Sequence, residues 1–299
     1  MKKCDLMLIV PLAEEFRVLC EVSAIKCSEV QGAIPHYTLN LPGSNYQTIA
    51  VVLGEMGKTP AGQITEKVFG SLEPKLAVML GICGALNEDL RLGDTIVASE
   101  VNEFLASSKA IQKDRSFAFK YSGNHWKTDF AILKCIQNYE FTDKNLYDAW
   151  RNHVKKFRES LGLSSVQLSL ANTMPKLKTG HIACGDTVAA STAYAIELMG
   201  IDRKFDAYDM ESAGFLQATS GREIPIRSMI VRGVADFANG RKKKLESVGD
   251  GMWRRYAMYS ASTFLFHLLR AKDFQKIIPP SIDQKGSEQK NEQWQRHYD

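Results

Sequence analysis

The chain has 299 residues, of which 44% are hydrophobic and 24% are charged, the composition of an ordinary globular protein. Its formal net charge of +4 is too small to favour nucleic acid as a partner, and its longest apolar run, residues 76–86, is too short to span a membrane. The six cysteines form no CxxC pair and no Cys/His cluster with zinc spacing. We therefore expect no metal or cofactor, and a reducing, cytoplasmic compartment.

Apolar runs, turn residues and helical periodicity predict strands and helices that alternate along the chain. In chain order these are a strand over 5–11, a helix over 12–22, strands over 36–41 and 46–54 with a turn at 42–45, a glycine-rich loop over 54–62, a helix over 60–72, strands over 75–86 and 93–99, helices over 128–140 and 145–163, a strand over 178–186, a helix over 194–200, a strand over 204–210, a helix over 211–220, a strand over 226–236 and a helix over 252–269. Because most of these strands are fully apolar, the pattern predicts one α/β domain.

The predicted domain spans residues 1–272. Within it, residues 105–175 are less regular and richer in charge than the remainder. After Lys272 the chain turns polar, and we expect residues 273–299 to form a poorly ordered tail.

Charged side chains stand where three of the predicted strands end. Glu15 follows the first strand, Glu211 follows the strand over 204–210, and the strand over 226–236 carries Arg232 and ends at Asp236. Taken singly, Glu15 and Glu211 also fit acids that complement a helix dipole, and Asp236 fits a helix cap. Arg232 needs a carboxylate partner if it is buried. Because ligands of α/β sheets bind beyond the carboxyl ends of the strands, the set indicates a binding site.

Six motifs in order resemble the nucleoside phosphorylase/nucleosidase superfamily. They are PLAEEF (11–16), GEMGKTPAG (54–62), LGICGALNEDLRLGDTIVAS (80–99), GHIACGD (180–186), DMESAG (209–214) and VRGVADFANG (231–240). The nearest branches are the methylthioadenosine/S-adenosylhomocysteine nucleosidases and the phosphorylase-like ATP nucleosidase domains of immune systems. The resemblance implies a single domain with a central mixed, twisted sheet flanked by helices.

The resemblance also implies cleavage of an N-ribosidic bond. Asp236 would protonate N7 of the departing purine, Glu211 would hold the ribose hydroxyls, and Glu15 would orient or deprotonate the attacking water. Other residues would contact the substrate or balance the carboxylates: Gly81, Ile82, Cys83, Gly84, Thr187, Val188, Ala189, Met210 and Arg232.

Two positions favour water over phosphate as the nucleophile. Phosphorylases of this superfamily bind phosphate with an Arg before the glycine turn and a Ser within it, and here those positions hold Met79 and Ile82. The chain departs from the family at Ala235, where Ser is frequent, and at Asn239, where a second acid is common. The alternatives left open are a methylthioadenosine/S-adenosylhomocysteine nucleosidase, a phosphate-dependent purine nucleoside phosphorylase and, least favoured, a non-catalytic nucleoside-binding module.

Basic residues near the motifs predict a phosphate at the 5′ end of the substrate. The candidates are Lys58, Arg203, Lys204 and Arg241, the last within the run RKKK (241–244). The expected partner is therefore a small purine nucleoside or nucleotide, with ATP or AMP preferred to a thioether, as in a defence effector. We also expect a homodimer or a higher homo-oligomer.

Overall fold

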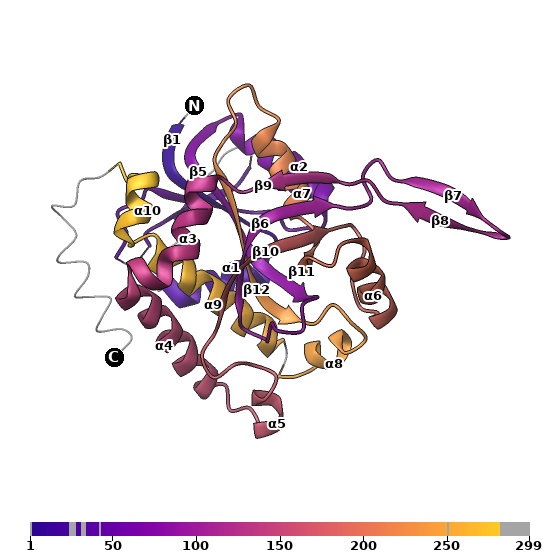
Figure 1. Cartoon of the computed structure of the whole chain (residues 1–299). Coiled ribbons are helices and arrows are strands. Elements are labelled where there is room, and N and C mark those ends of the chain that lie inside the picture. Colours follow the sequence, from indigo (N-terminus) through magenta and orange to yellow (C-terminus); the bar gives the residue numbers. More distant parts are fainter. Residues whose placement is uncertain (1, 24–27, 31–33, 42, 250, 282–299) are drawn as a thin grey trace.

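The computed structural model describes residues 2–23, 28–30, 34–41, 43–249 and 251–281, and most of its strands form one large sheet (Figure 1). The strands are β1 (Lys2–Val10), β2 (Ser28–Val30), β3 (His36–Leu39), β4 (Thr48–Val52), β5 (Leu72–Ala85), β6 (Thr95–Glu103), β7 (Lys109–Lys113), β8 (Ser116–Lys120), β9 (Asn124–Lys127), β10 (Leu177–Cys184), β11 (Phe205–Asp209) and β12 (Ser228–Asp236).

The large sheet runs in the order β11-β10-β6-β12-β5-β1-β4-β3-β2, with β9 paired to β6. β12 pairs in parallel with β5 and antiparallel with β6, so the sheet is mixed, as expected. An additional antiparallel pairing between β11 and β5 curls half of the sheet back on itself. As a result Gly84 of β5 lies opposite Tyr208 of β11 on one side and Asp236 of β12 on the other.

Helices cover both faces of the central strands. They are α1 (Ala13–Ser23), α2 (Lys58–Phe69), α3 (Phe130–Thr142), α4 (Lys144–Ser160), α5 (Ser165–Leu168), α6 (Thr192–Ile201), α7 (Ser212–Ser220), α8 (Lys242–Glu246), α9 (Met252–Leu268) and α10 (Lys272–Ile277).

The two helix layers meet β12 through alternate residues. Gly233 faces the backbone of α9, which also packs against α1 and α4, whereas Arg232 faces the start of α7, which packs against α2. Successive residues of a strand point to opposite faces, so β12 is buried on both sides, and eight of its nine residues are buried.

Several boundaries and elements differ from the sequence expectations. β1 begins at Lys2, β6 continues to Glu103, and α2 begins at Lys58, so Pro60 lies inside its first turn. The missed elements are short or largely exposed, and their burial pattern is therefore weak in the sequence: β2, β7, β8, β9, α5, α8 and α10. Pro42, in the predicted turn, lies outside the described residues.

The tail predicted from residue 273 was placed too early. α10 buries Phe274, and the Tyr46 hydroxyl donates a hydrogen bond of 2.5 Å to the carbonyl of Ile278. The segment packs against the core through Phe274 and Ile278, although most of its residues are polar. The residues that it packs against lie elsewhere in the sequence, so local composition does not reveal this contact. Residues 282–299 are outside the described part of the chain.

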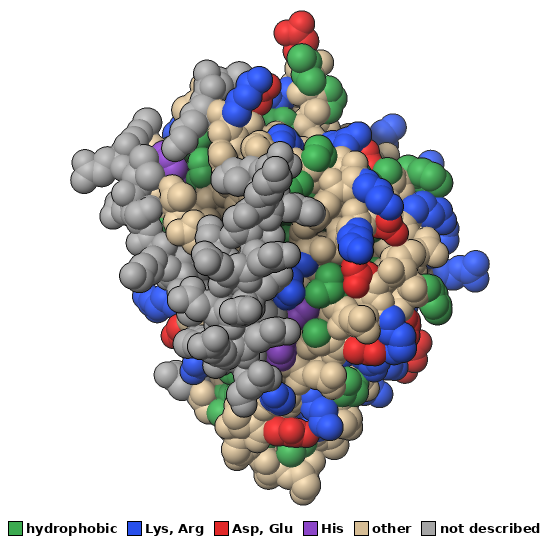
Figure 2. Space-filling view, turned by 90° about the vertical axis from the view of Figure 1, so that its left-hand side faces the viewer, with side chains coloured by type: hydrophobic (Ala, Val, Ile, Leu, Met, Phe, Trp, Pro, Cys, Tyr) green, Lys and Arg blue, Asp and Glu red, His purple; other side chains and the backbone are tan. Residues whose placement is uncertain are grey.

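The β7–β8 hairpin projects from the surface and extends away from the sheet (Figure 1). On the face shown in Figure 2, basic side chains are interspersed with acidic ones rather than gathered in a stripe. None of the helices in the described residues has the length and apolarity needed to cross a membrane.

Candidate active site

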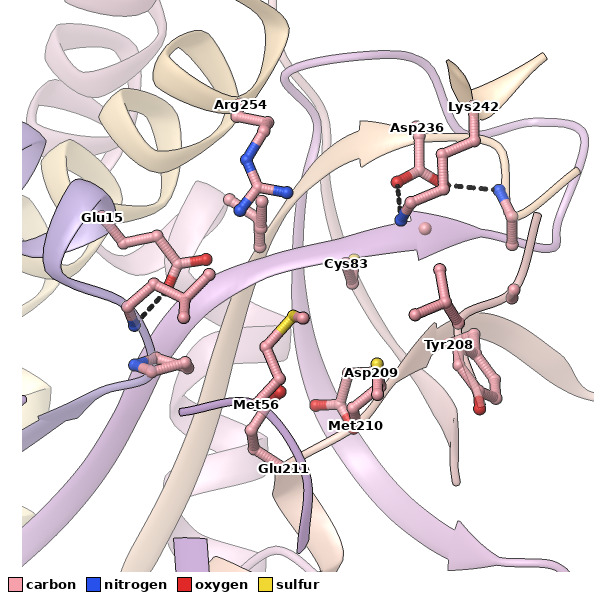
Figure 3. A pocket seen from close by; sticks show the side chains of 17 residues that line it. Glu15, Met56, Cys83, Tyr208, Asp209, Met210, Glu211, Asp236, Lys242 and Arg254 are labelled. Carbon is pink, nitrogen blue, oxygen red and sulfur yellow. Dashed lines mark hydrogen bonds and ion pairs between the residues drawn. The ribbon is translucent and has the colours of Figure 1, made fainter. Parts of the chain in front are cut away.

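A pocket lies at the carboxyl ends of β1, β5, β11 and β12, where the sheet curls (Figure 3). Its walls are contributed by strand ends, by the start of α1 and by α8 and α9: Pro11, Leu12, Glu15, Met56, Ile82, Cys83, Gly84, Val188, Ala189, Tyr208, Asp209, Met210, Glu211, Asp236, Ala238, Lys242 and Arg254. The structure thus brings Glu15, Glu211 and Asp236 to one place, although 221 residues separate Glu15 from Asp236 in the sequence.

Arg232 is the buried cation behind the acids. Its side chain is 0% exposed, and its guanidinium lies 2.7 Å from the Oδ2 atom of Asp209 and 3.3 Å from the Oε2 atom of Glu211. The sequence requirement for a carboxylate partner is met twice. The same Nη2 group also donates to the sulfur of Met79 at 3.1 Å, so Met79, predicted to stand where phosphorylases carry a phosphate-binding Arg, is an apolar, buried neighbour of this cluster.

The two glycines of the turn, Gly81 and Gly84, leave space for the side chains of Arg232 and Asp236. A Cβ atom at Gly81 would lie 2.3 Å from the Nη1 atom of Arg232, and one at Gly84 would lie 2.6 Å from the Oδ1 atom of Asp236. Any side chain there would displace the arginine or the acid. Gly81 does not line the pocket, whereas Ile82, Cys83 and Gly84 do.

Glu15 lies in the first turn of α1, which follows β1 closely. Its side chain accepts a hydrogen bond from the backbone N–H of Leu12 at 3.3 Å, and the residue is 4% exposed. Burial raises the pKa of Glu15 to about 7, with Arg232 and Arg254 opposing that rise and Glu211 adding to it. A carboxyl group with such a pKa can accept a proton near neutral pH.

Glu211 stands between β11 and α7, as the residue that precedes the first turn of the helix. Its Oε1 atom accepts a hydrogen bond from the backbone N–H of Gly57 at 3.3 Å, which fixes it against the start of α2. Burial raises the pKa of Glu211, and Arg232 opposes the rise. The other acid of this motif, Asp209, bonds the hydroxyl of Ser212 and so serves the arginine and the helix start.

Asp236 ends β12 after a change of register between Val234 and Asp236, an irregularity that re-aims the side chain. Its Oδ1 atom accepts from the backbone N–H of Ala238 at 2.7 Å, and its Oδ2 atom forms an ion pair of 2.8 Å with the ammonium group of Lys242 on α8. Ala235 has no hydroxyl group that could bond Asp236, unlike the Ser that is frequent at this position in the family, and Lys242 provides a polar contact to Asp236 instead.

The wall beside Asp236 is largely apolar. It contains Val188, Ala189 and Tyr208, and the Tyr208 hydroxyl donates to the carbonyl of Thr187 at 2.5 Å. Thr187 thus supports the wall through its backbone and does not itself line the pocket. Burial raises the pKa of the Cys83 thiol, so Cys83 is a neutral part of the wall.

The four predicted phosphate-binding residues do not line this pocket. Lys58 is already paired, bonding Glu103 and lying 3.3 Å from Asp186. Arg203 and Lys204 are exposed and precede β11, whereas the acids follow it, and a five-residue strand separates the two ends by roughly 16 Å. Arg241 is exposed before α8, and its neighbour Lys242 enters the pocket instead.

Sequence reasoning missed Arg254, which lies at the start of α9 and lines the pocket across from Met56 (Figure 3). A signal was available, because a cation in the first turn opposes the helix dipole and therefore needs another reason to be there. Met56 comes from the glycine loop before α2 and is 52% exposed.

A family model described as the Phosphorylase superfamily matches residues 5–261, and the protein belongs to that superfamily. The match runs from within β1 to within α9 and includes every pocket residue.

The individual relatives share low sequence identity with this chain. A death domain-containing ATP nucleosidase of Amphimedon queenslandica is 21% identical over 72% of this chain and 37% of its own length. A 5′-methylthioadenosine/S-adenosylhomocysteine nucleosidase of Staphylococcus haemolyticus is 23% identical over 66% of this chain and 72% of its own. The chain spans about half or less of two curated relatives that it matches.

Among solved structures, the same kind of nucleosidase from Neisseria meningitidis, in complex with methylthio-immucillin-A, has a similar fold. Its TM-score is 0.60 at 17% identity, and the match covers 90% of this chain and 99% of that one.

Proposed function

We propose that this protein is a nucleosidase that hydrolyses the N-ribosidic bond of an adenine nucleoside or nucleotide, with water as the nucleophile. The observation that carries the proposal is the convergence of Glu15, Glu211 and Asp236 on one pocket around the buried Arg232. Relatives named as nucleosidases of adenosine derivatives support the choice of substrate class.

In the proposed reaction, the base lies on the wall of Val188, Ala189 and Tyr208. The C1′–N9 bond breaks, and its electron pair passes to the base. The base takes a proton at N7 from the carboxyl group of Asp236. Glu211 accepts hydrogen bonds from the ribose hydroxyls and stabilises the positive charge that develops on the sugar. Glu15 takes a proton from the water whose oxygen bonds to C1′.

Lys242 is assigned as the group behind Asp236. Its ammonium is 2.8 Å from the carboxylate, and the pair faces the pocket (Figure 3). It holds the acid in place, and exchange with solvent returns the proton that the base removes from Asp236 and takes away the one that Glu15 accepts. This role differs from the phosphate contact expected of the RKKK run.

A methylthioadenosine/S-adenosylhomocysteine nucleosidase is the second candidate, and a specific observation favours it. Leu12 and Met56 give the end of the pocket near Glu15 an apolar wall, which suits a thioether. The two candidates share the same bond cleavage and differ only in the 5′ group.

The test incubates the protein with adenosine, AMP, ATP, methylthioadenosine and inosine in phosphate-free buffer, with chromatographic detection of free base. We expect free adenine and a reducing sugar, at a rate that added phosphate does not change. The Asp236→Asn variant should lose about 10²–10⁴-fold in rate while remaining folded, because an amide cannot give up a proton to the base. A sugar 1-phosphate product, or a strict need for phosphate, would show a phosphorylase instead.

A further inference from the structure

The pocket has two ends with different chemistry (Figure 3). Asp236, Lys242 and Tyr208 form one end, and Met210 and Glu211 form the middle. If the base and the ribose take these places, as the proposed function requires, the 5′ carbon faces the other end. That end is lined by Leu12, Met56 and Arg254, with Glu15 beside them.

Arg254 differs from the other two cations of the pocket, because each of those is bonded to a pocket acid. Arg232 is held by Asp209 and Glu211, and Lys242 is held by Asp236. Arg254 bonds no acid of the pocket. It bonds Glu14, whose side chain is 54% exposed and lies outside the pocket lining.

The Arg254 guanidinium has N–H groups that form no hydrogen bond with the described residues. Nη2 bonds Glu14, whereas Nη1 lies 4.0 Å from Glu246, too far for a hydrogen bond. Nε is buried and has no hydrogen-bond partner among the described residues. The side chain is 26% exposed and lines the pocket, and the two acids that interact with it, Glu14 and Glu246, are not part of the pocket lining.

A neutral 5′ group would leave these donors without a partner once it displaced water, and an unpaired buried donor is costly. An anionic oxygen group would satisfy them with charge-assisted bonds, for which the guanidinium fork is well suited. We infer that Arg254 recognises an anionic oxygen group on the 5′ side of the substrate, and that the preferred substrates are 5′-anionic adenine nucleosides. This inference rests on the proposed function and names its substrate class.

Phosphate and carboxylate share this chemistry, so the experiment separates them. Values of kcat/KM are measured for AMP and ATP, which carry phosphate, for S-adenosylhomocysteine, which carries a carboxylate, and for the neutral adenosine and methylthioadenosine. The variants are Arg254→Met and Arg254→Lys. The matched control is Arg255→Met, because Arg255 is the next residue, is exposed, and pairs with Glu21 at 2.9 Å away from the pocket.

We expect the wild type to prefer anionic substrates and Arg254→Met to lower the anionic-to-neutral ratio by about 10- to 100-fold, the effect of losing one or two charge-assisted bonds. Arg254→Lys should restore part of the ratio, and Arg255→Met should leave it unchanged. A selective loss on AMP and ATP identifies phosphate, and a selective loss on S-adenosylhomocysteine identifies the carboxylate. An equal loss on all five substrates, or a wild-type preference for methylthioadenosine that Arg254→Met does not alter, would overturn the inference and leave the hydrolase standing.

Binding separates this inference from the proposed function. The Asp236→Asn protein, with and without Arg254→Met, is titrated with AMP and adenosine by calorimetry. Tighter binding of AMP that depends on Arg254 supports the anion contact even if no base is ever released. Release of base from every substrate without an Arg254-dependent difference in affinity contradicts it.

Discussion

Glu15 shows how one buried carboxyl group links activity to stability. Burial raises its pKa to about 7, well above its ordinary value of 4.5. In the proposed reaction the ionised form accepts the proton of water, so hydrolysis should rise with pH and level off above about pH 7. The measurement is kcat/KM against pH for wild type, and Glu15→Gln should be inactive at every pH.

The raised pKa of Glu15 also makes the stability of the fold depend on pH. Because this pKa is higher in the folded state, the contribution of Glu15 is fully present below about pH 4.5 and is lost as pH rises towards 7. A tenfold change in the acid's proton affinity corresponds to about 1.4 kcal/mol, so Glu15→Gln should raise the free energy of unfolding above pH 7. Glu21→Gln, on the exposed side of the same helix, is the control and should change neither profile. A wild-type rate that is flat across this range would remove Glu15 as the base.

Lys242 is predicted to act on the chemical step through Asp236. Replacing it with Met removes the ammonium 2.8 Å from the carboxylate, so kcat should fall by roughly 10-fold or more, with a smaller change in KM. Lys242→Arg should recover part of the rate. Lys243→Met, an exposed neighbour on α8, serves as the control. A fall in affinity for AMP with an unchanged kcat would instead return Lys242 to phosphate binding.

At the scale of elements, the helices α2 and α7 cross closely beside the site. A Cβ atom at Gly214 would lie 1.9 Å from the carbonyl oxygen of Lys58, and one at Gly62 would lie 3.2 Å from the carbonyl of Gly214. These two glycines let the start of α2 reach the pocket, where the N–H of Gly57 holds Glu211. The position of Glu211, a proposed catalytic residue, therefore depends on a helix crossing.

Gly214→Ala tests this dependence. Within most helices Ala is more favourable than Gly by up to about 1 kcal/mol, but here we expect a loss of roughly 1–3 kcal/mol in the free energy of unfolding, because the methyl group meets backbone. Activity should fall with it as α2 shifts. Gly200→Ala in α6 is the matched control, since nothing lies within 4 Å of its Cβ position, and it should stabilise the protein. Urea unfolding gives the free energy of unfolding of both variants. A Gly214→Ala protein that is more stable than wild type would refute the prediction that α2 and α7 are too close for a methyl group.

The elements that sequence predicted are those whose burial shows in the residue pattern. The central strands are continuous apolar runs. Glu15 and Glu211 come soon after β1 and β11, and Asp236 is the last residue of β12. The exposed hairpin β7–β8 and the short helices have no such pattern. Arg203 and Lys204 were misplaced because closeness in sequence to the DMES motif was taken for closeness in space, and a strand has two ends.

Arg254 and Lys242 could not be placed from sequence for a different reason. Both come after the last predicted strand, and the turn at Ala238 and the short helix α8 decide which of several neighbouring cations faces inward. Local periodicity does not record that choice. The homodimer and the defence role remain predictions, and sedimentation of the purified chain tests the first.

For the whole molecule, the pocket is a product of the complete fold. Its lining runs from Pro11 to Arg254 and draws on β5, β11, β12, α1, α8, α9 and the loops between elements, so no part of the chain contains it alone. A ligand that binds there binds the folded state and not the unfolded chain, and must therefore raise the stability of the whole domain.

Adenine, the expected product, should raise the midpoint of thermal unfolding in a concentration-dependent way. At about 100 times its dissociation constant the gain is about 2.7 kcal/mol, which corresponds to roughly 5 °C for a domain of this size. Inorganic phosphate should not enlarge that shift, because Met79 and Ile82 occupy the positions at which the family resemblance predicts a phosphate-binding Arg and Ser. Sulfate at equal ionic strength controls for the general stabilising effect of such salts. A phosphate-specific increase in the adenine shift, absent with sulfate, would mean that the pocket holds both together, and the nucleophile would then have to be phosphate.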